Sequence, residues 1–259
     1  MRVFFILAVG LLGGSPAPAQ QQGPSPKAIA VWRAKAENGD AKAQYNIGLA
    51  YFDGLGLAKD ETEGVKWWRK AAEQGDPKAQ YNLGVSYENG QGVPKDKAEA
   101  AKWHRKAAGQ GFAEAQYNLG VMYANGQGVP KDQAEALKLY RLASAKGYAL
   151  AQYNLGVSYA LGHGLHKDET TAAKWYRKAA EQGFSDAQNN LGFMYARGQG
   201  VPVDEIEAYK WCLLAAAQGD DEAKKGAKSL ERSLTPEQRA EGERRAREFK
   251  PAKAPAAAR

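Results

Sequence analysis

Few residues of this chain have both the type and the spacing that chemistry requires. His163 and His166 are separated by two residues, a spacing that a metal ion could use. Both lie in a glycine-rich loop, however, and a zinc site needs further ligands that the single cysteine of the chain does not supply. The third histidine, His104, falls in a repeated helical row of large residues. We therefore expect no metal site and no cofactor.

Motifs for nucleophilic or phosphate chemistry are missing from the sequence. The chain has no G-x-S-x-G turn, no phosphate-binding glycine loop and no H-E-x-x-H pair. Its one cysteine, Cys212, shares the helical row of His104, which favours a buried structural thiol. An inter-chain disulfide and a reactive thiol are the alternatives. The sequence predicts no catalytic residue, and we expect a protein that is not an enzyme.

A repeat of 36 residues dominates the chain instead. It occurs five times without insertion or deletion, at residues 43–78, 79–114, 115–150, 151–186 and 187–222. Self-similarity at such a period is typical of solenoids, in which each unit buries its apolar face only against its neighbours.

The signals for helix ends divide each copy into two helices. In the second copy, Asp76 precedes a proline and begins the first helix, and Gly90 is suited to end it in a left-handed conformation. Asp96 begins the second helix, and Glu99 three residues later predicts a capping box. Gly111 is expected to end that helix. Each copy is thus a short helix, a glycine loop, a second helix and a glycine turn.

Glycines recur in the middle of the first helix, where each costs about 1 kcal/mol relative to alanine. They are Gly48, Gly84, Gly120, Gly156 and Gly192. Their recurrence indicates that a large side chain presses against the bare backbone. The candidates on the second helix are Trp67, Trp103, Trp175 and Trp211.

These residues resemble a known family. The pattern A-x-Y-N-L-G-x-x-Y-x-x-G-x-G-V-x-x-D, followed by W-x-x-K-A-A-x-x-G, is similar to the Sel-1-like repeat family, a relative of the tetratricopeptide repeat. The resemblance covers the five copies, residues 43–222. It implies an all-α fold, a right-handed α-solenoid, that serves as a scaffold for protein interactions. It names no partner.

The resemblance also implies a binding site. In tetratricopeptide relatives, an asparagine in the matching Y-N-L-G context faces the concave groove and holds peptide backbone or carboxylate. The corresponding residues here are Asn46, Asn82, Asn118, Asn154 and Asn190, with Tyr81, Tyr117 and Tyr153 beside them. The alternative is that each amide bonds a carbonyl of the adjacent repeat.

We therefore expect a non-catalytic scaffold that binds a protein or peptide partner in the concave groove. The alternatives are an enzyme or binder acting on cell-wall-related material, of the β-lactam or peptidoglycan class, and a structural solenoid that assembles with itself. The sequence leaves the oligomeric state open.

The two ends of the chain differ from the repeats. Residues 1–19 have a basic start, a ten-residue apolar run and the small residues Ala17-Pro18-Ala19, which is typical of a cleaved signal peptide. We expect an exported protein, periplasmic or secreted, that does not span the membrane after cleavage; a retained membrane anchor is the alternative. The remaining segments are expected to be a linker (20–26), an N-terminal half-repeat cap (27–42), C-terminal capping helices (223–250) and a disordered tail (251–259).

Positive charge is concentrated near the C-terminus. The formal net charge is +7, and from residue 223 onward eleven Lys or Arg stand against five Glu. This excess indicates either attraction to an anionic partner or a solvated helix face on which the arginines lie beside Glu241, Glu243 and Glu248. Because the charge is local, we expect no binding to nucleic acid.

Overall fold

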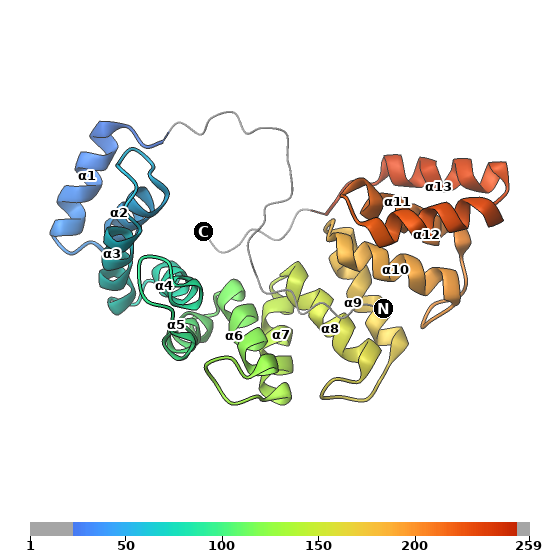
Figure 1. The fold of residues 1–259 in the computed structure, drawn as a ribbon, viewed down its shortest axis with the longest axis horizontal. Coiled ribbons are helices and arrows are strands. Elements are labelled where there is room, and N and C mark those ends of the chain that lie inside the picture. The colour runs from blue at the N-terminus through green and yellow to red at the C-terminus, as the bar shows by residue number, and fades with distance from the viewer. Residues whose placement is uncertain (1–22, 253–259) are drawn as a thin grey trace. The chain divides into compact units, whose positions relative to one another are not determined.

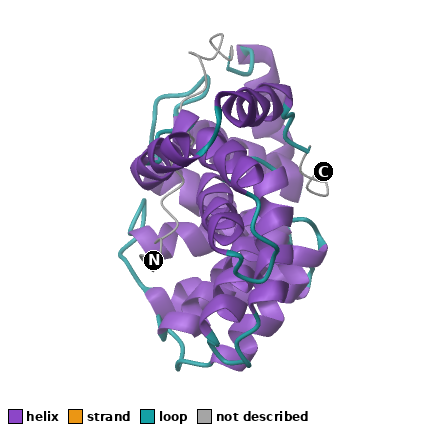
Figure 2. Ribbon diagram, turned by 90° about the vertical axis from the view of Figure 1, so that its right-hand side faces the viewer, coloured by secondary structure: helices purple, strands orange, loops and turns teal. Residues whose placement is uncertain are grey.

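The computed structural model describes residues 23–252, and these residues form thirteen α-helices without a strand (Figure 1 and Figure 2). The prediction of an all-α solenoid, built from helix pairs with a period of about 36 residues, is confirmed. The expected signal peptide, residues 1–19, lies outside the described residues, and so do 253–259 of the expected tail.

Each copy contributes two helices of similar length. The first helices are α2 (Ala41–Asp53), α4 (Pro77–Asn89), α6 (Ala113–Asn125), α8 (Ala149–Leu161) and α10 (Ser185–Arg197). The second helices are α3 (Glu61–Glu73), α5 (Lys97–Gly109), α7 (Gln133–Ala145), α9 (Glu169–Glu181) and α11 (Glu205–Ala217). Helix α1 (Pro26–Glu37) precedes them, and α12 (Asp221–Ser233) and α13 (Pro236–Glu248) follow.

The helices belong to two compact units. The first unit extends to Asp132 and contains α1–α6, and the second begins at Gln133 and contains α7–α13. Within each unit, consecutive helices up to α12 pack side by side, and α13 packs against α11 (Figure 1). The boundary falls inside the third copy.

The predicted signals begin and end α4, the first helix of the second copy. The Asp76 carboxylate accepts a hydrogen bond from the Ala79 N–H at 2.7 Å and so caps α4. Gly90 ends the same helix with a φ of 78°, a left-handed conformation that glycine adopts without strain. The glycines that end the first helix in this way are Gly54, Gly90, Gly126, Gly162 and Gly198.

The second helix of the same copy differs from its prediction at both ends. It ends at Gly109 with Gln110 as its C-cap, one residue before the predicted Gly111. Asp96 caps α5 by accepting from the N–H groups of Ala98 and Glu99, as expected. The side chain of Glu99 does not complete a capping box, because it pairs with Lys102 at 2.9 Å. The capping box that does form lies in α13, between Thr235 and Gln238.

The large residues that face the mid-helix glycines are also not the predicted ones. The prediction named Trp67 and its equivalents, but Gly48 packs against Trp68, one position further along. Consecutive residues of a helix point about 100° apart, so the expected row faces elsewhere. The pairs observed are Gly48 with Trp68, Gly84 with His104, Gly156 with Tyr176, and Gly192 with Cys212.

The C-terminal helices cover the end of the second unit. Leu234, which is buried, packs with Tyr209 and Cys212 of α11. The ring of Phe249 meets Trp211 edge-on at 5.5 Å between centroids. Beyond α13, the Ala252 N–H donates to the Glu181 carbonyl at 2.7 Å, so the first residues after the helix return to the end of α9.

Candidate functional site

Buried glutamines form the most regular polar contacts of the molecule. In α2, the Gln44 amide nitrogen donates to the Ala36 carbonyl of the preceding helix at 3.0 Å. Its amide oxygen accepts from Gln74, at the end of α3, at 2.7 Å. One buried side chain thereby ties three consecutive helices together.

The same arrangement repeats in other copies. The bonds to a carbonyl of the preceding helix are Gln80 with Ala72, Gln116 with Ala108, and Gln188 with Ala180. The bonds between two glutamines are Gln80 with Gln110, Gln152 with Gln182, and Gln188 with Gln218. The sequence analysis missed this row, although a glutamine at one position of every copy was a signal. Because hydrogen bonds between helices hold these buried amides, the row stabilises the stack; the amide oxygens of Gln116 and Gln182 are buried without a partner among residues 23–252.

The predicted asparagine row lies on the first helices, next to tyrosines of neighbouring elements. Burial raises the pKa of Tyr45 in α2, and a hydrogen-bonding contact with the Asn82 amide of α4 opposes that rise. Tyr81 and Asn118 are related in the same way one copy later. The amides therefore contact tyrosine hydroxyls of the preceding copy, a partner that the sequence analysis did not consider.

In the second unit, a tyrosine of a second helix also contacts an asparagine of the row. There the Asn190 amide of α10 contacts the hydroxyl of Tyr176, which lies on α9. Burial is the main cause of the raised pKa of Tyr176. The ring of Tyr153 lies 5.7 Å from that of Tyr176 and 5.1 Å from that of Phe184, so it is part of a packed aromatic group.

The predicted site residues differ in exposure. Tyr117 and Asn118, both on α6, retain only 3% and 7% of their accessible surface. The others are half-buried: Asn46, Asn82 and Tyr81 in the first unit, and Asn154, Asn190 and Tyr153 in the second. The half-buried amides are the ones that a ligand could reach without a rearrangement.

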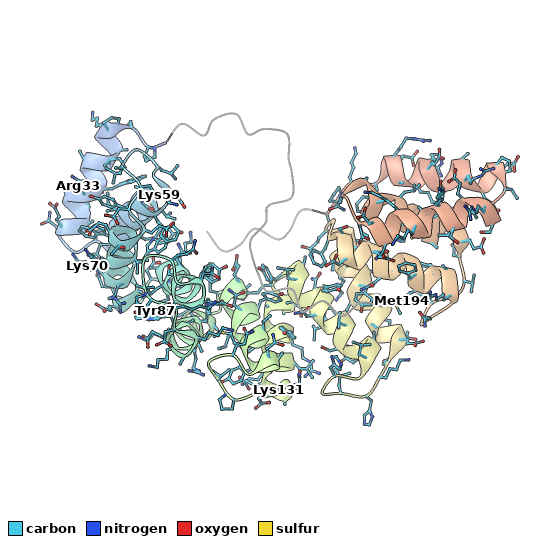
Figure 3. The ribbon with its side chains drawn as sticks, viewed as in Figure 1. Arg33, Lys59, Lys70, Tyr87, Lys131 and Met194 are labelled. Carbon is cyan, nitrogen blue, oxygen red and sulfur yellow. The ribbon has the colours of Figure 1, made fainter. Side chains whose placement is uncertain are left out.

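A row of arginines holds the last tyrosine of the first helices. Arg33 of α1 donates to the Tyr51 hydroxyl at 3.0 Å, and Arg105 of α5 donates to Tyr123 at the same distance. Arg69 with Tyr87 and Arg177 with Tyr195 form equivalent pairs. Arg33 and Tyr87 mark this row in Figure 3. Each pair joins neighbouring copies and fixes the position of a phenol at the surface.

The residues considered for chemistry belong to three different elements: α5, the loop after α8 and α11. His104 is fully buried against Gly84, with its Nε2 3.6 Å from a carboxylate oxygen of Glu88. His163 and His166 are exposed in the loop after α8. Burial raises the pKa of the Cys212 thiol to about 12, which keeps it protonated and unreactive. Among residues 23–252 no group of three or more metal-ligating side chains comes together.

Comparison with known sequences identifies the repeat. The sequence model of the Sel1 repeat matches five consecutive segments, at residues 41–76, 77–112, 113–148, 149–184 and 185–220. The chain belongs to the Sel1 repeat family. Proteins of this family are generally scaffolds for protein interactions and generally not enzymes. The matched segments begin two residues before the copies predicted from the sequence, at the first residue of each first helix.

Solved structures of Sel1 repeat proteins resemble this chain. One is a protective antigen of uropathogenic Escherichia coli strains with an SLR fold, at 36% identity and a TM-score of 0.81, covering 89% of this chain and 50% of that one. Another is a Sel1 repeat protein from Oxalobacter formigenes, at 38% identity and a TM-score of 0.73, covering 79% of this chain and 59% of that one. The chain thus spans between half and three fifths of their lengths. No curated protein matches it.

Five basic residues between the last Sel1 repeat and residue 252 form ion pairs: Lys224, Lys225, Arg244, Arg245 and Arg247. Arg244 bonds Glu241 at 2.8 Å and Glu248 at 2.6 Å, and Arg245 bonds Glu207 of α11 at 2.9 Å. These contacts favour the interpretation that the arginines belong to a solvated face of α13, which an ion pair also joins to α11. Within the described part of the chain, no helix is both long and apolar enough to cross a bilayer.

Proposed function

We propose that this Sel1 repeat protein is a non-catalytic scaffold that binds a peptide or protein segment on the exposed face of its first helices. The observation that carries the proposal is the position of Asn82, a half-buried amide on α4 that contacts Tyr45 of the preceding copy. An amide has two N–H donors and a carbonyl with two lone pairs, so one tyrosine contact leaves capacity for a ligand.

The surroundings of these amides favour an extended ligand. Asn46 and Asn82 occupy equivalent positions on α2 and α4, so they offer the same donors and acceptors at a regular interval. Extended main chain presents carbonyl and N–H groups that such amides recognise. The contact with Tyr45 restricts the Asn82 side chain in advance, which reduces the entropy lost when a ligand binds.

A double substitution separates binding from folding. In the Asn46→Ala, Asn82→Ala variant, we expect weaker capture of the partner, by about 0.5–1.5 kcal/mol for each hydrogen bond lost, with little change in melting temperature. The partner would first be identified by affinity capture with the intact protein and mass spectrometry. Asn38→Ala, an exposed change in the turn after α1, is the matched control and should capture normally.

The opposite pattern would count against this site. If the double variant melts several degrees earlier and still captures its partner normally, the asparagines act as internal fasteners between copies. The binding surface would then have to lie elsewhere on the repeats.

We also propose that the protein is exported and acts in the periplasm or outside the cell. The support is the order of residues near the start: Arg2, an apolar run and Ala17-Pro18-Ala19. The mature chain should begin at or near Gln20. Amino-terminal sequencing of protein from the cell envelope tests this, and an intact Met1 on that material would refute it.

A further inference from the structure

The second unit contains a cleft that the site above does not use. It lies between α9 and the turn at Gly200 and Val201, and its volume is about 570 Å³. Its walls include Thr171, Lys174, Trp175, Lys178, Glu181 and Val201.

One position makes the fourth copy different from the other four. In those copies, a glutamate in the first turn of the second helix pairs with a lysine three residues later, as in Glu63 with Lys66, Glu99 with Lys102, Glu135 with Lys138, and Glu207 with Lys210, at 2.9–3.2 Å. In α9 the glutamate is replaced by Thr171, whose hydroxyl donates to Asp168 at 2.6 Å. Lys174 therefore forms no ion pair within residues 23–252, and it lines the cleft.

The rest of the lining combines positive charge with an aromatic surface. Arg177 and Lys178 also line the cleft, and Glu181 is the one acid on its walls. The Lys178 ammonium lies 4.4 Å from the centroid of the Trp175 ring. An anionic ligand with an apolar portion would match both features, since the cations would attract its charge and the indole would cover its carbon atoms.

Extended backbone already lies at one end of α9. After α13 the chain is extended at Phe249, with φ −64° and ψ 127°, and Pro251 lies near Gly183. The Ala252 N–H donates to the Glu181 carbonyl, and the side chain of Glu181 is part of the cleft wall. The end of this helix thus accommodates extended main chain beside the cleft.

We propose that this cleft binds an acidic, extended segment of a partner protein, with a carboxylate of the segment taking the place of the glutamate that Thr171 replaces. Lys174 and Lys178 bind the carboxylate, and Trp175 contacts the apolar part of the segment. The inference shares one assumption with the proposed function, namely that the ligand is a protein segment. The two sites are otherwise independent, because the cleft shares no residue with the asparagine row.

The test uses a defined probe with the whole protein. The probe is a short fluorescein-labelled peptide in which glutamate alternates with alanine around one phenylalanine, and its twin has glutamine for every glutamate. Fluorescence anisotropy should show binding of the acidic peptide that weakens with salt, and weaker binding of the twin.

Two variants of the cleft and one control assign the binding. Thr171→Glu restores the acid found in the other copies, so it should pair with Lys174 and weaken binding by about threefold to fivefold. It should fold normally, because a glutamate in the first turn suits a helix. Lys174→Glu should weaken binding further, and Lys102→Glu, the equivalent change in the first unit, should leave it unchanged.

Three results would overturn the inference: equal binding of the two peptides, unchanged binding in Thr171→Glu and Lys174→Glu, or binding of anionic lipid vesicles with the same dependence on Thr171 and no peptide binding. The proposed function is judged separately. If capture of the cellular partner depends on Asn46 and Asn82 while the peptide fails to bind, only the cleft is wrong. If the peptide binds through Lys174 and capture does not depend on the asparagines, only the asparagine site is wrong.

Discussion

The ring of Tyr176 lies against the backbone of Gly156, so closely that a β-carbon on this glycine would stand 2.6 Å from Tyr176 Cδ1. Such a distance is shorter than real side chains tolerate, so one of the two helices would have to move. The glycine in the middle of α8 is therefore required by the contact between α8 and α9.

Substitution of Gly156 by leucine should destabilise the second unit by about 1–3 kcal/mol or more, because the added side chain overpacks this contact. Gly109→Ala is the control, since a β-carbon there meets no atom within 4 Å. It should be neutral or slightly stabilising. Thermal melts followed by circular dichroism compare the two, and equal melting temperatures would show that the glycine row does not pack as described.

The sequence could predict this packing only in part. Asp76 and Gly90 are local signals, because each caps the helix to which it belongs, and so they predicted the ends of α4. The contact between Gly84 and His104 depends on how α4 and α5 are rotated against each other. Spacing within one helix does not contain that rotation, which is why the neighbouring Trp103 was chosen in error.

Two further features depend on contacts between helices that the sequence pattern does not specify. Gln80 is in a helix, where glutamine is usually a solvent-exposed helix former, so its recurrence in every copy did not by itself indicate burial. Thr171 replaces a glutamate of the other copies, but the consequence for Lys174 depends on the cleft between α9 and Val201. Both are properties of contacts between elements rather than of one segment.

Loss of a glutamine fastener should destabilise the first unit. Gln80→Ala removes the donor to the Ala72 carbonyl and the acceptor for Gln110. Because this site is buried, the groups left behind lose partners without gaining water, at a cost of about 1–3 kcal/mol. Urea denaturation should show an earlier midpoint than that of Gln127→Ala, a change in the glycine loop after α6. Coincident midpoints would mean that the glutamine contacts contribute nothing to stability.

The thiol of Cys212 should be unreactive in the folded protein. It is 1% exposed, and burial raises its pKa to about 12, so the reactive thiolate is scarce at any moderately alkaline pH. A thiol-specific reagent should label the chain slowly in native buffer and fully in denaturant. Non-reducing electrophoresis should show no dimer linked through this residue. Rapid labelling of the native protein would instead show that α11 is accessible.

The pH dependence of stability should reveal the carboxyl of Asp186 at the start of α10. Burial, followed by the nearby charge of Asp220, raises the pKa of Asp186 above its ordinary value, so the ionised form is disfavoured in the folded state. Asp186→Asn removes that charge and should raise the melting temperature by about 1–4 °C at neutral pH. The gain should shrink as pH falls through the raised pKa and vanish below the ordinary value, where the wild-type carboxyl is neutral in both states.

Asp221→Asn is the control, and its effect should have the opposite sign. The ion pair with Lys224 lowers the pKa of Asp221, so loss of the Asp221 charge should lower stability at neutral pH. A gain for Asp186→Asn that persists in acid would mean that the asparagine stabilises α10 by another route than relief of this charge.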